Sequence, residues 1–179
     1  MVLNLKIIPK AYSETEEVLN IISNKFNKNY TSKKEMKNLS DYFDKVAFIE
    51  SEGGKVNKLT SAKGNFQFLT ANNSPGKNDN SFQVALNRYE NLTGSSPEWL
   101  KNARETNDPL QLTYEQEKAL AIANLAKMDK PTLKLFDSIA QKGYKNNPDA
   151  YSLYADYHHT NPDDDTKLRA ESILEILNN

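Results

Sequence analysis

The sequence predicts a mainly α domain with one small β-hairpin. Most segments repeat apolar residues at the spacing of an amphipathic helix, and several of these segments begin with a capping residue. Only residues 53–68 combine glycines with short apolar spacings typical of a hairpin. The chain has 179 residues, which is enough to bury a core without disulfides or metals. We divide it into a helical appendage, residues 1–35, and a main domain, residues 36–179.

The first third of the chain predicts three helical segments. Residues 14–29 form an amphipathic pattern, and Thr31 or Ser32 can cap a short second segment. Ser40 can cap a third segment, which ends near Glu50. The apolar residues of this third segment are Tyr42, Phe43, Val46, Ala47 and Ile49.

Helical patterns return after the hairpin and continue to the end of the sequence. Residues 71–80 are rich in Asn, Ser, Pro and Gly and predict a loop. Ser96 precedes Pro97 and predicts a capped start with proline in the first turn. Thr113 and Gln116 have capping-box spacing. The later helical segments are expected to begin near Phe82, Ser96, Thr113, Pro131, Pro148 and Thr166.

Composition excludes several function classes. The 23 basic and 24 acidic residues nearly cancel, so no overall charge favours nucleic acid. The absence of Cys excludes disulfides, thiolate metal sites and a cysteine nucleophile. No apolar run approaches the roughly 18 residues of a membrane helix, and Asn4 and Lys6 interrupt the apolar start, so we expect no signal peptide. His158 and His159 lack a third ligand, so we expect no metal and no cofactor.

Glu50 is the first candidate catalytic residue. It follows Phe48 and Ile49 at the C-terminal end of a predicted apolar helix. The negative end of the helix dipole and apolar neighbours both favour the protonated form of a carboxyl group, as a general acid requires. An exposed Glu with no catalytic role is nevertheless the commoner case for a single carboxylate of this kind.

Three motifs in order carry a resemblance to a known family. They are Glu50-Ser51, the segment from Gly64 to Gln67, and the late aromatic cluster around Tyr154. Over residues 40–160 the chain resembles the soluble lytic transglycosylase and goose-type lysozyme branch of the lysozyme-like superfamily. The members most similar to it are peptidoglycan-degrading proteins of phage virions. The resemblance implies a lysozyme-like multi-helix domain with a small β lobe after the catalytic helix.

The resemblance also implies roles for individual residues. Glu50 matches the catalytic acid, and Ser51 matches the residue that helps to hold the acid or the substrate. Gln67 matches the glutamine that contacts an N-acetyl sugar. Tyr157 is the better match to the tyrosine that orients the acid, with Tyr154 as the alternative. The residues after Tyr157 depart from the family pattern, which leaves both tyrosines open.

The implied reaction cleaves the β-1,4 bond between N-acetylmuramic acid and N-acetylglucosamine. Hydrolysis in most glycosidases needs a second carboxylate. The candidates are Glu52, Asp79 and residues 163–165, and Asp79 is preferred because its loop borders the expected cleft. The family also provides a route without a second carboxylate, in which the 6-hydroxyl of the muramic acid attacks and a 1,6-anhydro sugar forms. We favour this lytic transglycosylase outcome over hydrolysis.

The expected partners are peptidoglycan glycan strands, with other virion proteins as further candidates, and neither nucleic acid nor membrane. We expect the protein in a phage virion, acting in the bacterial periplasm or cell wall. The alternative is a catalytically inactive structural component of the virion that keeps the lysozyme-like fold, because a fold does not guarantee its chemistry.

Overall fold

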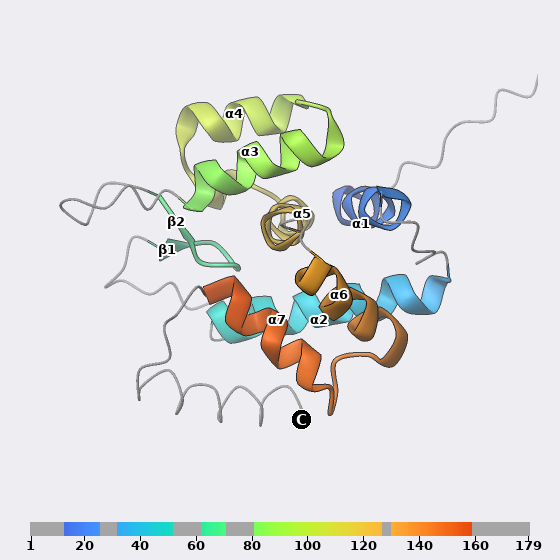
Figure 1. Cartoon of the computed structure of the whole chain (residues 1–179). Coiled ribbons are helices and arrows are strands. Elements are labelled where there is room, and N and C mark those ends of the chain that lie inside the picture. The colour runs from blue at the N-terminus through green and yellow to red at the C-terminus, as the bar shows by residue number, and fades with distance from the viewer. Residues whose placement is uncertain (1–12, 26–31, 52–61, 71–80, 127–129, 159–179) are drawn as a thin grey trace, which may run out of the picture.

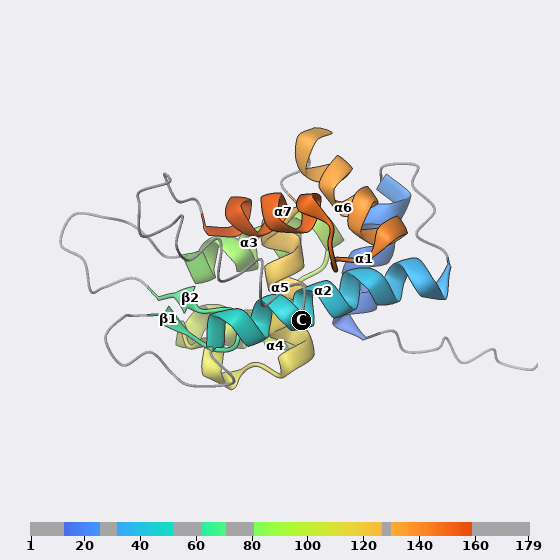
Figure 2. The ribbon, with the colours of Figure 1, turned by 90° about the horizontal axis from the view of Figure 1, so that it is seen from below.

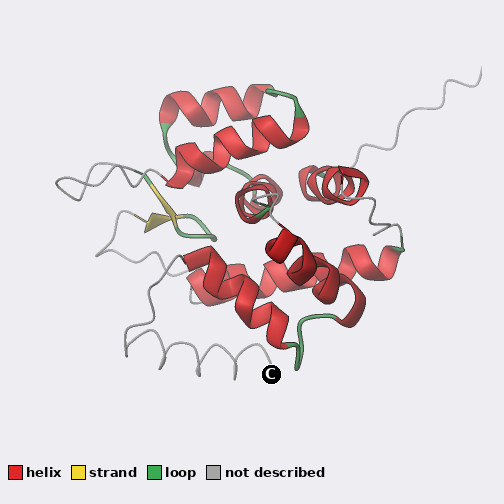
Figure 3. Cartoon of the chain, in the orientation of Figure 1, coloured by secondary structure: helices red, strands yellow, loops and turns green. Residues whose placement is uncertain are grey.

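The computed structural model describes residues 13–25, 32–51, 62–70, 81–126 and 130–158. The prediction of a mainly α protein with one small hairpin is confirmed, as Figure 3 shows in red and yellow. The elements are α1 Glu14–Lys25, α2 Lys33–Ser51, β1 Ala62–Lys63, β2 Phe68–Leu69, α3 Ser81–Thr93, α4 Glu98–Thr106, the 3-10 turn η1 Pro109–Gln111, α5 Tyr114–Leu125, α6 Lys130–Lys142 and α7 Pro148–His158.

Helix α5 is the centre of the molecule and is seen end-on in Figure 1. The other elements surround it, with α3 and α4 on one side, α1 on a second, and α2, α6 and α7 on a third. An apolar sequence around most of its circumference suits this position. Its start is fixed by the predicted capping box, in which Thr113 and Gln116 bond reciprocally. Its buried residues are Glu117, Lys118, Ala119, Leu120, Ala121, Ile122, Ala123 and Leu125.

Helix α2 is one continuous helix, so the prediction of two segments divided at Ser40 is wrong. Ser32 does cap the helix: its Oγ accepts a hydrogen bond from Glu35 N at 3.1 Å. Ser40 lies inside the helix, where its Oγ accepts a hydrogen bond from the buried Lys118 Nζ at 2.7 Å. A tertiary partner therefore satisfies the hydroxyl that the sequence assigned to a cap.

Helix α6 packs against α2 and α7, and α7 also packs against α5 (Figure 2). Asn38 of α2 donates to Ala140 O near the end of α6 at 2.8 Å. Asn147 accepts a hydrogen bond from Asp149 N at 3.1 Å, immediately before Pro148 begins α7. The predicted end of α6 at Gly143 is confirmed, and its φ of +79° explains the choice of glycine.

Helix α1 shares the core with the rest of the described chain. Val18, Leu19 and Ile22 are buried and belong to the same cluster as the apolar residues of α2, α3 and α5. The boundary of the expected appendage, residues 1–35, stays a prediction. Helix α1, which lies within these residues, packs on α5 and α3.

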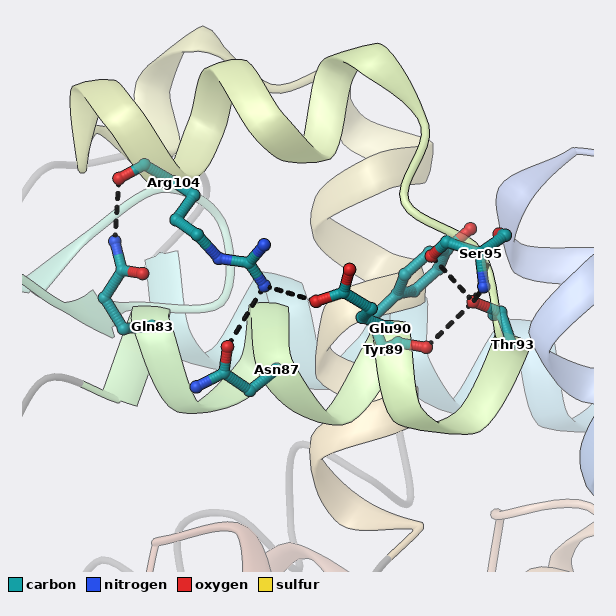
Figure 4. Close-up of polar contacts among 7 residues, drawn as sticks. All are labelled: Gln83, Asn87, Tyr89, Glu90, Thr93, Ser95 and Arg104. Carbon is teal, nitrogen blue, oxygen red and sulfur yellow. Dashed lines mark hydrogen bonds and ion pairs between the residues drawn. The ribbon is translucent and has the colours of Figure 1, made fainter.

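Helices α3 and α4 form a hairpin on the outside of α5 (Figure 4). Arg104 of α4 donates to Asn87 and Glu90 of α3 at 3.0 and 2.8 Å. Pro97 is the residue that precedes α4, with no side-chain capping bond, so the predicted cap at Ser96 is wrong by one position. Proline has no side-chain acceptor for a capping bond, and its extended conformation starts the helix directly.

Parts of the predicted pattern fall on residues outside the described ranges. These are residues 26–29 of the first helix, residues 53–61, the 71–80 loop and the last helix from Thr166. Among the described helices, none combines the length and the apolar character that crossing a bilayer requires.

Candidate active site

Glu50 lies in the last turn of α2 and is half-buried. The phenolic OH of Tyr154, on α7, donates a hydrogen bond to Glu50 Oε1. Tyr154 is only 6% exposed, so the core holds its ring in place. The structure therefore brings together two of the residues that the sequence selected, from segments more than 100 residues apart.

The contact between Glu50 and Tyr154 is supported by a second link between the same two helices. Tyr42 is completely buried on α2, and its OH donates to Ala150 O in the first turn of α7 at 3.1 Å. Ala150 precedes Tyr154 by one helical turn, so the two bonds attach α7 to α2 at points one turn apart along α7. Two points of attachment reduce the freedom of the tyrosine hydroxyl.

Ser51 is the last residue of α2 and is buried. Its Oγ donates to Ala47 O, one turn earlier in the helix, at 2.8 Å. This bond occupies the hydroxyl proton at the helix end. The predicted role of Ser51 in holding substrate stays a prediction.

Gln67 lies on the β-hairpin, in the turn formed by Gly64, Asn65, Phe66 and Gln67, which we call the 64–67 turn. The strands pair in an antiparallel register, with Ala62 opposite Leu69 and Lys63 opposite Phe68. Two residues of this turn have a left-handed backbone conformation, with φ of +79° at Gly64 and +50° at Gln67. Gln67 Nε2 donates to Gly64 O at 2.9 Å, which folds the glutamine across the turn.

The hairpin is attached to the helical body at several points. Phe66 and Phe68 are buried, and the Phe68 ring lies 5.7 Å from the ring of Phe82 on α3. Ser81 accepts a hydrogen bond from Leu69 N at 2.7 Å. Lys63 Nζ lies 3.3 Å from Asp108 Oδ1, just before η1. Aromatic burial and these polar contacts hold the hairpin against the start of α3 and the residue before η1.

Glu117 of α5 lies under the 64–67 turn and was not selected from the sequence. It is 3% exposed, and its Oε2 accepts a hydrogen bond from Asn65 N at 2.6 Å. Its Oε1 accepts from Asn65 Nδ2 at 3.2 Å. Burial raises the pKa of the Glu117 carboxyl above its ordinary value, and the hydrogen bonds from Asn65 and Phe66 oppose part of this rise. The available sequence signal was a charged pair with Lys118 directly before the apolar run from Ala119 to Ala123.

A second buried charge on α5 is paired with α2. Lys118 Nζ lies 2.6 Å from Asp44 Oδ1, which also accepts a hydrogen bond from Tyr114 OH at 2.5 Å. Burial, followed by the bond to Asp44, raises the pKa of the Tyr114 phenol well above its usual value. This cluster joins α2 and α5, the two helices that carry Glu50 and Glu117.

The remaining predicted site residues lie outside the described structure. Tyr157 falls in α7, but its side chain is not among the described ones, so its role stays a prediction. The candidates for a second carboxylate, Glu52, Asp79 and residues 163–165, also fall outside the described ranges. Within the described residues, no group of three or more His, Asp or Glu side chains could hold a metal ion.

Comparisons with protein-family models, with curated proteins and with solved structures found no match to this chain.

Proposed function

We propose that this protein is a peptidoglycan-degrading enzyme that cleaves the β-1,4 bond between N-acetylmuramic acid and N-acetylglucosamine, with Glu50 as its acid and base. The observation that carries the proposal is the hydrogen bond from Tyr154 OH to Glu50 Oε1 at the end of α2. The motif resemblance to lytic transglycosylases and goose-type lysozymes supplies the substrate, the lysozyme-like fold and the location in a phage virion. These belong to the same proposal.

In the proposed reaction, Glu50 first acts as an acid. Because Tyr154 holds Oε1, the transferred proton is carried by Oε2 and passes to the glycosidic oxygen as the bond to the muramic acid carbon breaks. Donation from a phenol stabilises the carboxylate that this transfer leaves. The N-acetyl carbonyl of the muramic acid supports the developing positive charge on the sugar. Gln67, in the 64–67 turn, is assigned to bind an N-acetyl group.

Glu50 then acts as a base. The carboxylate takes the proton from the 6-hydroxyl of the muramic acid, and the oxygen forms a bond to the sugar's own anomeric carbon. The product is a 1,6-anhydro sugar, the acid is regenerated, and no water is consumed. We favour this outcome over hydrolysis because it requires no second carboxylate.

The deciding experiment compares Glu50→Gln with Glu105→Gln, a control at an exposed position on α4. Glutamine keeps the shape of Glu50 but cannot transfer the proton, so purified cell walls should no longer be cleared. The control should clear them at the wild-type rate, and both should keep the wild-type helical spectrum. More than a tenth of wild-type activity in Glu50→Gln would remove Glu50 from the reaction. A wild-type protein that clears no walls would favour the inactive structural component.

Two further measurements refine the reaction. Mass spectrometry separates an anhydro product from a reducing-end sugar, which is heavier by one water, and only reducing ends would overturn the preference for transglycosylase chemistry. Gln67→Ala should slow turnover without unfolding the protein, and an unchanged rate would remove Gln67 from the site.

A further inference from the structure

We propose that Glu117 is a positioning residue that sets the conformation of the 64–67 turn and thereby the glycan-binding position of Gln67. This inference rests on the proposed function and extends it to a residue at the centre of the fold. Glu117 accepts hydrogen bonds from backbone and side-chain N–H groups of the turn. It therefore acts on substrate only through Gln67.

The donors around Glu117 all belong to the turn. Asn65 supplies its backbone N–H at 2.6 Å and its side-chain Nδ2 at 3.2 Å, and the backbone N–H of Phe66 also donates. A carboxylate has two oxygens that only accept, so it can satisfy donors that converge from several directions. A glutamine would turn its own NH₂ group toward one of them. The local chemistry therefore requires a carboxylate at this position.

Gly64 completes the fit between α5 and the turn. A Cβ on Gly64 would lie 2.5 Å from Glu117 Oε2, closer than real contacts allow. The carboxylate thus occupies the space that any other residue at position 64 would need. The close approach places the carboxylate beside the first residue of the turn, while Gln67 closes the turn through its bond to Gly64 O.

Gln67 needs such support because its own backbone is unfavourable. Its φ of +50° lies in the left-handed region, which a residue with a Cβ adopts only when its surroundings enforce it. Asn65 and Phe66, the residues held by Glu117, immediately precede it. Loss of the carboxylate should therefore allow the turn to relax and should move the Gln67 side chain.

The hairpin as a whole does not depend on Glu117 alone. Phe68 packs on Phe82, Leu69 N is bound to Ser81, and Lys63 is paired with Asp108. A change at Glu117 should leave these contacts in place and should alter the turn between the strands. The acid itself, Glu50, is held by α7 rather than by the hairpin.

The test uses Glu117→Gln, with Glu115→Gln on the same helix as the matched control. Both are placed in the Glu50→Gln background, so that a tetrasaccharide of alternating N-acetylglucosamine and N-acetylmuramic acid is bound but not cleaved. We expect Glu117→Gln to raise the dissociation constant on the order of tenfold, as for a lost charge-assisted hydrogen bond, and to raise amide exchange at Asn65 and Phe66. The control should change neither.

Enzyme kinetics separate positioning from a general structural role. With Glu50 intact, Glu117→Gln should raise KM and leave kcat within about twofold, because the contact between Glu50 and Tyr154 is made by other helices. Asn65→Ala, which removes only the side-chain donor, should weaken binding less and serves if Glu117→Gln fails to fold.

The outcomes distinguish the two proposals. If Glu50→Gln alone fails to bind the tetrasaccharide, the proposed function fails and takes this inference with it. If it binds, and neither Glu117→Gln nor Asn65→Ala changes the dissociation constant, only the positioning role of Glu117 is overturned. A loss of kcat in Glu117→Gln with no change in KM would overturn it as well.

Discussion

Tyr154 on α7 donates a hydrogen bond to Glu50 Oε1 at the C-terminal end of α2, across 104 positions of sequence. The two helices are joined a second time by Tyr42 and Ala150. A carboxyl group with one oxygen held by a buried phenol has a defined orientation for its second oxygen. That orientation is the physical basis of the proposed proton transfer, and it can be tested without disturbing the fold.

Tyr154→Phe removes the donor but keeps the buried ring. A hydrogen bond to a charged group contributes roughly 1.5–3 kcal/mol, so we expect wall clearing to slow by about 10- to 100-fold. The free energy of unfolding should fall by no more than about 3 kcal/mol, because only this bond is lost. Tyr151→Phe, on the same helix, is the control and should keep the wild-type rate in a turbidity assay. An unchanged rate in Tyr154→Phe would show that the contact has no role in the reaction.

Gly64→Ala and Gly94→Ala separate backbone strain from crowding. Both glycines have left-handed backbones, with φ of +79° and +68°, so both variants pay about 1–2 kcal/mol for conformation. Only Gly64 faces the Glu117 carboxylate, whereas a Cβ at Gly94 has nothing within 4 Å. Urea unfolding should show an extra loss of about 1–3 kcal/mol in Gly64→Ala. Equal losses would mean that the turn moves freely away from α5.

The stability difference between wild type and Glu117→Gln should depend on pH. Burial raises the folded-state pKa of Glu117 above the ordinary 4.5, so the folded state binds the proton more readily than the unfolded state. The stability from this group is therefore fully present below the unfolded pKa and is lost as pH rises through the folded pKa. Glutamine does not titrate, so the difference isolates Glu117.

Urea unfolding of both proteins from about pH 4 to pH 7 measures this dependence. The advantage of wild type over Glu117→Gln should be largest at the acidic end and should decline toward neutral pH. Glu115→Gln should show no comparable trend relative to wild type. A wild-type advantage that grows with pH would mean that the hydrogen bonds from the 64–67 turn outweigh desolvation.

Local signals in the sequence predicted the elements whose ends depend on nearby residues. The Thr113 capping box and the end of α6 at Gly143 involve partners within a few positions, and both are present in the structure. Ser40 was misassigned because its hydroxyl bonds Lys118 from another helix. A partner on a distant helix leaves no pattern in the sequence around Ser40.

In the candidate site, too, local motifs could be recognised from the sequence, whereas contacts between distant segments could not. Glu50 could be selected because the helix end and the adjacent serine form a local motif. The sequence placed Tyr157 ahead of Tyr154, whereas the structure shows Tyr154 bonded to Glu50. Residues three apart on a helix point in directions that differ by about 60°, so the position of α2 is needed to identify a tyrosine that reaches Glu50. Glu117 was missed because its partners, Asn65 and Phe66, lie about 50 residues earlier, and no local pattern around Glu117 points to the 64–67 turn.

The two partners of the Asp44–Lys118 pair should contribute unequally to stability. The side chain of Lys118 is 2% exposed and that of Asp44 is 47% exposed. Asp44→Ala leaves a buried ammonium that still has Ser40 Oγ as an acceptor, so we expect a loss of stability near the lower end of the roughly 3–5 kcal/mol typical of broken buried pairs. Lys118→Met leaves a carboxylate that water and Tyr114 still solvate, so its loss should be about 1 kcal/mol.

Urea unfolding of both single variants and of the double variant measures this asymmetry. The double variant should be more stable than Asp44→Ala alone, because methionine removes the stranded charge and packs among the apolar residues of α5. Equal losses in the two single variants would mean that the ammonium reaches water when Asp44 is absent. A double variant less stable than either would mean that Asp44→Ala strands no charge. In either case the pair would not fix α2 against α5, and the attachment of the two helices would rest on their apolar contacts.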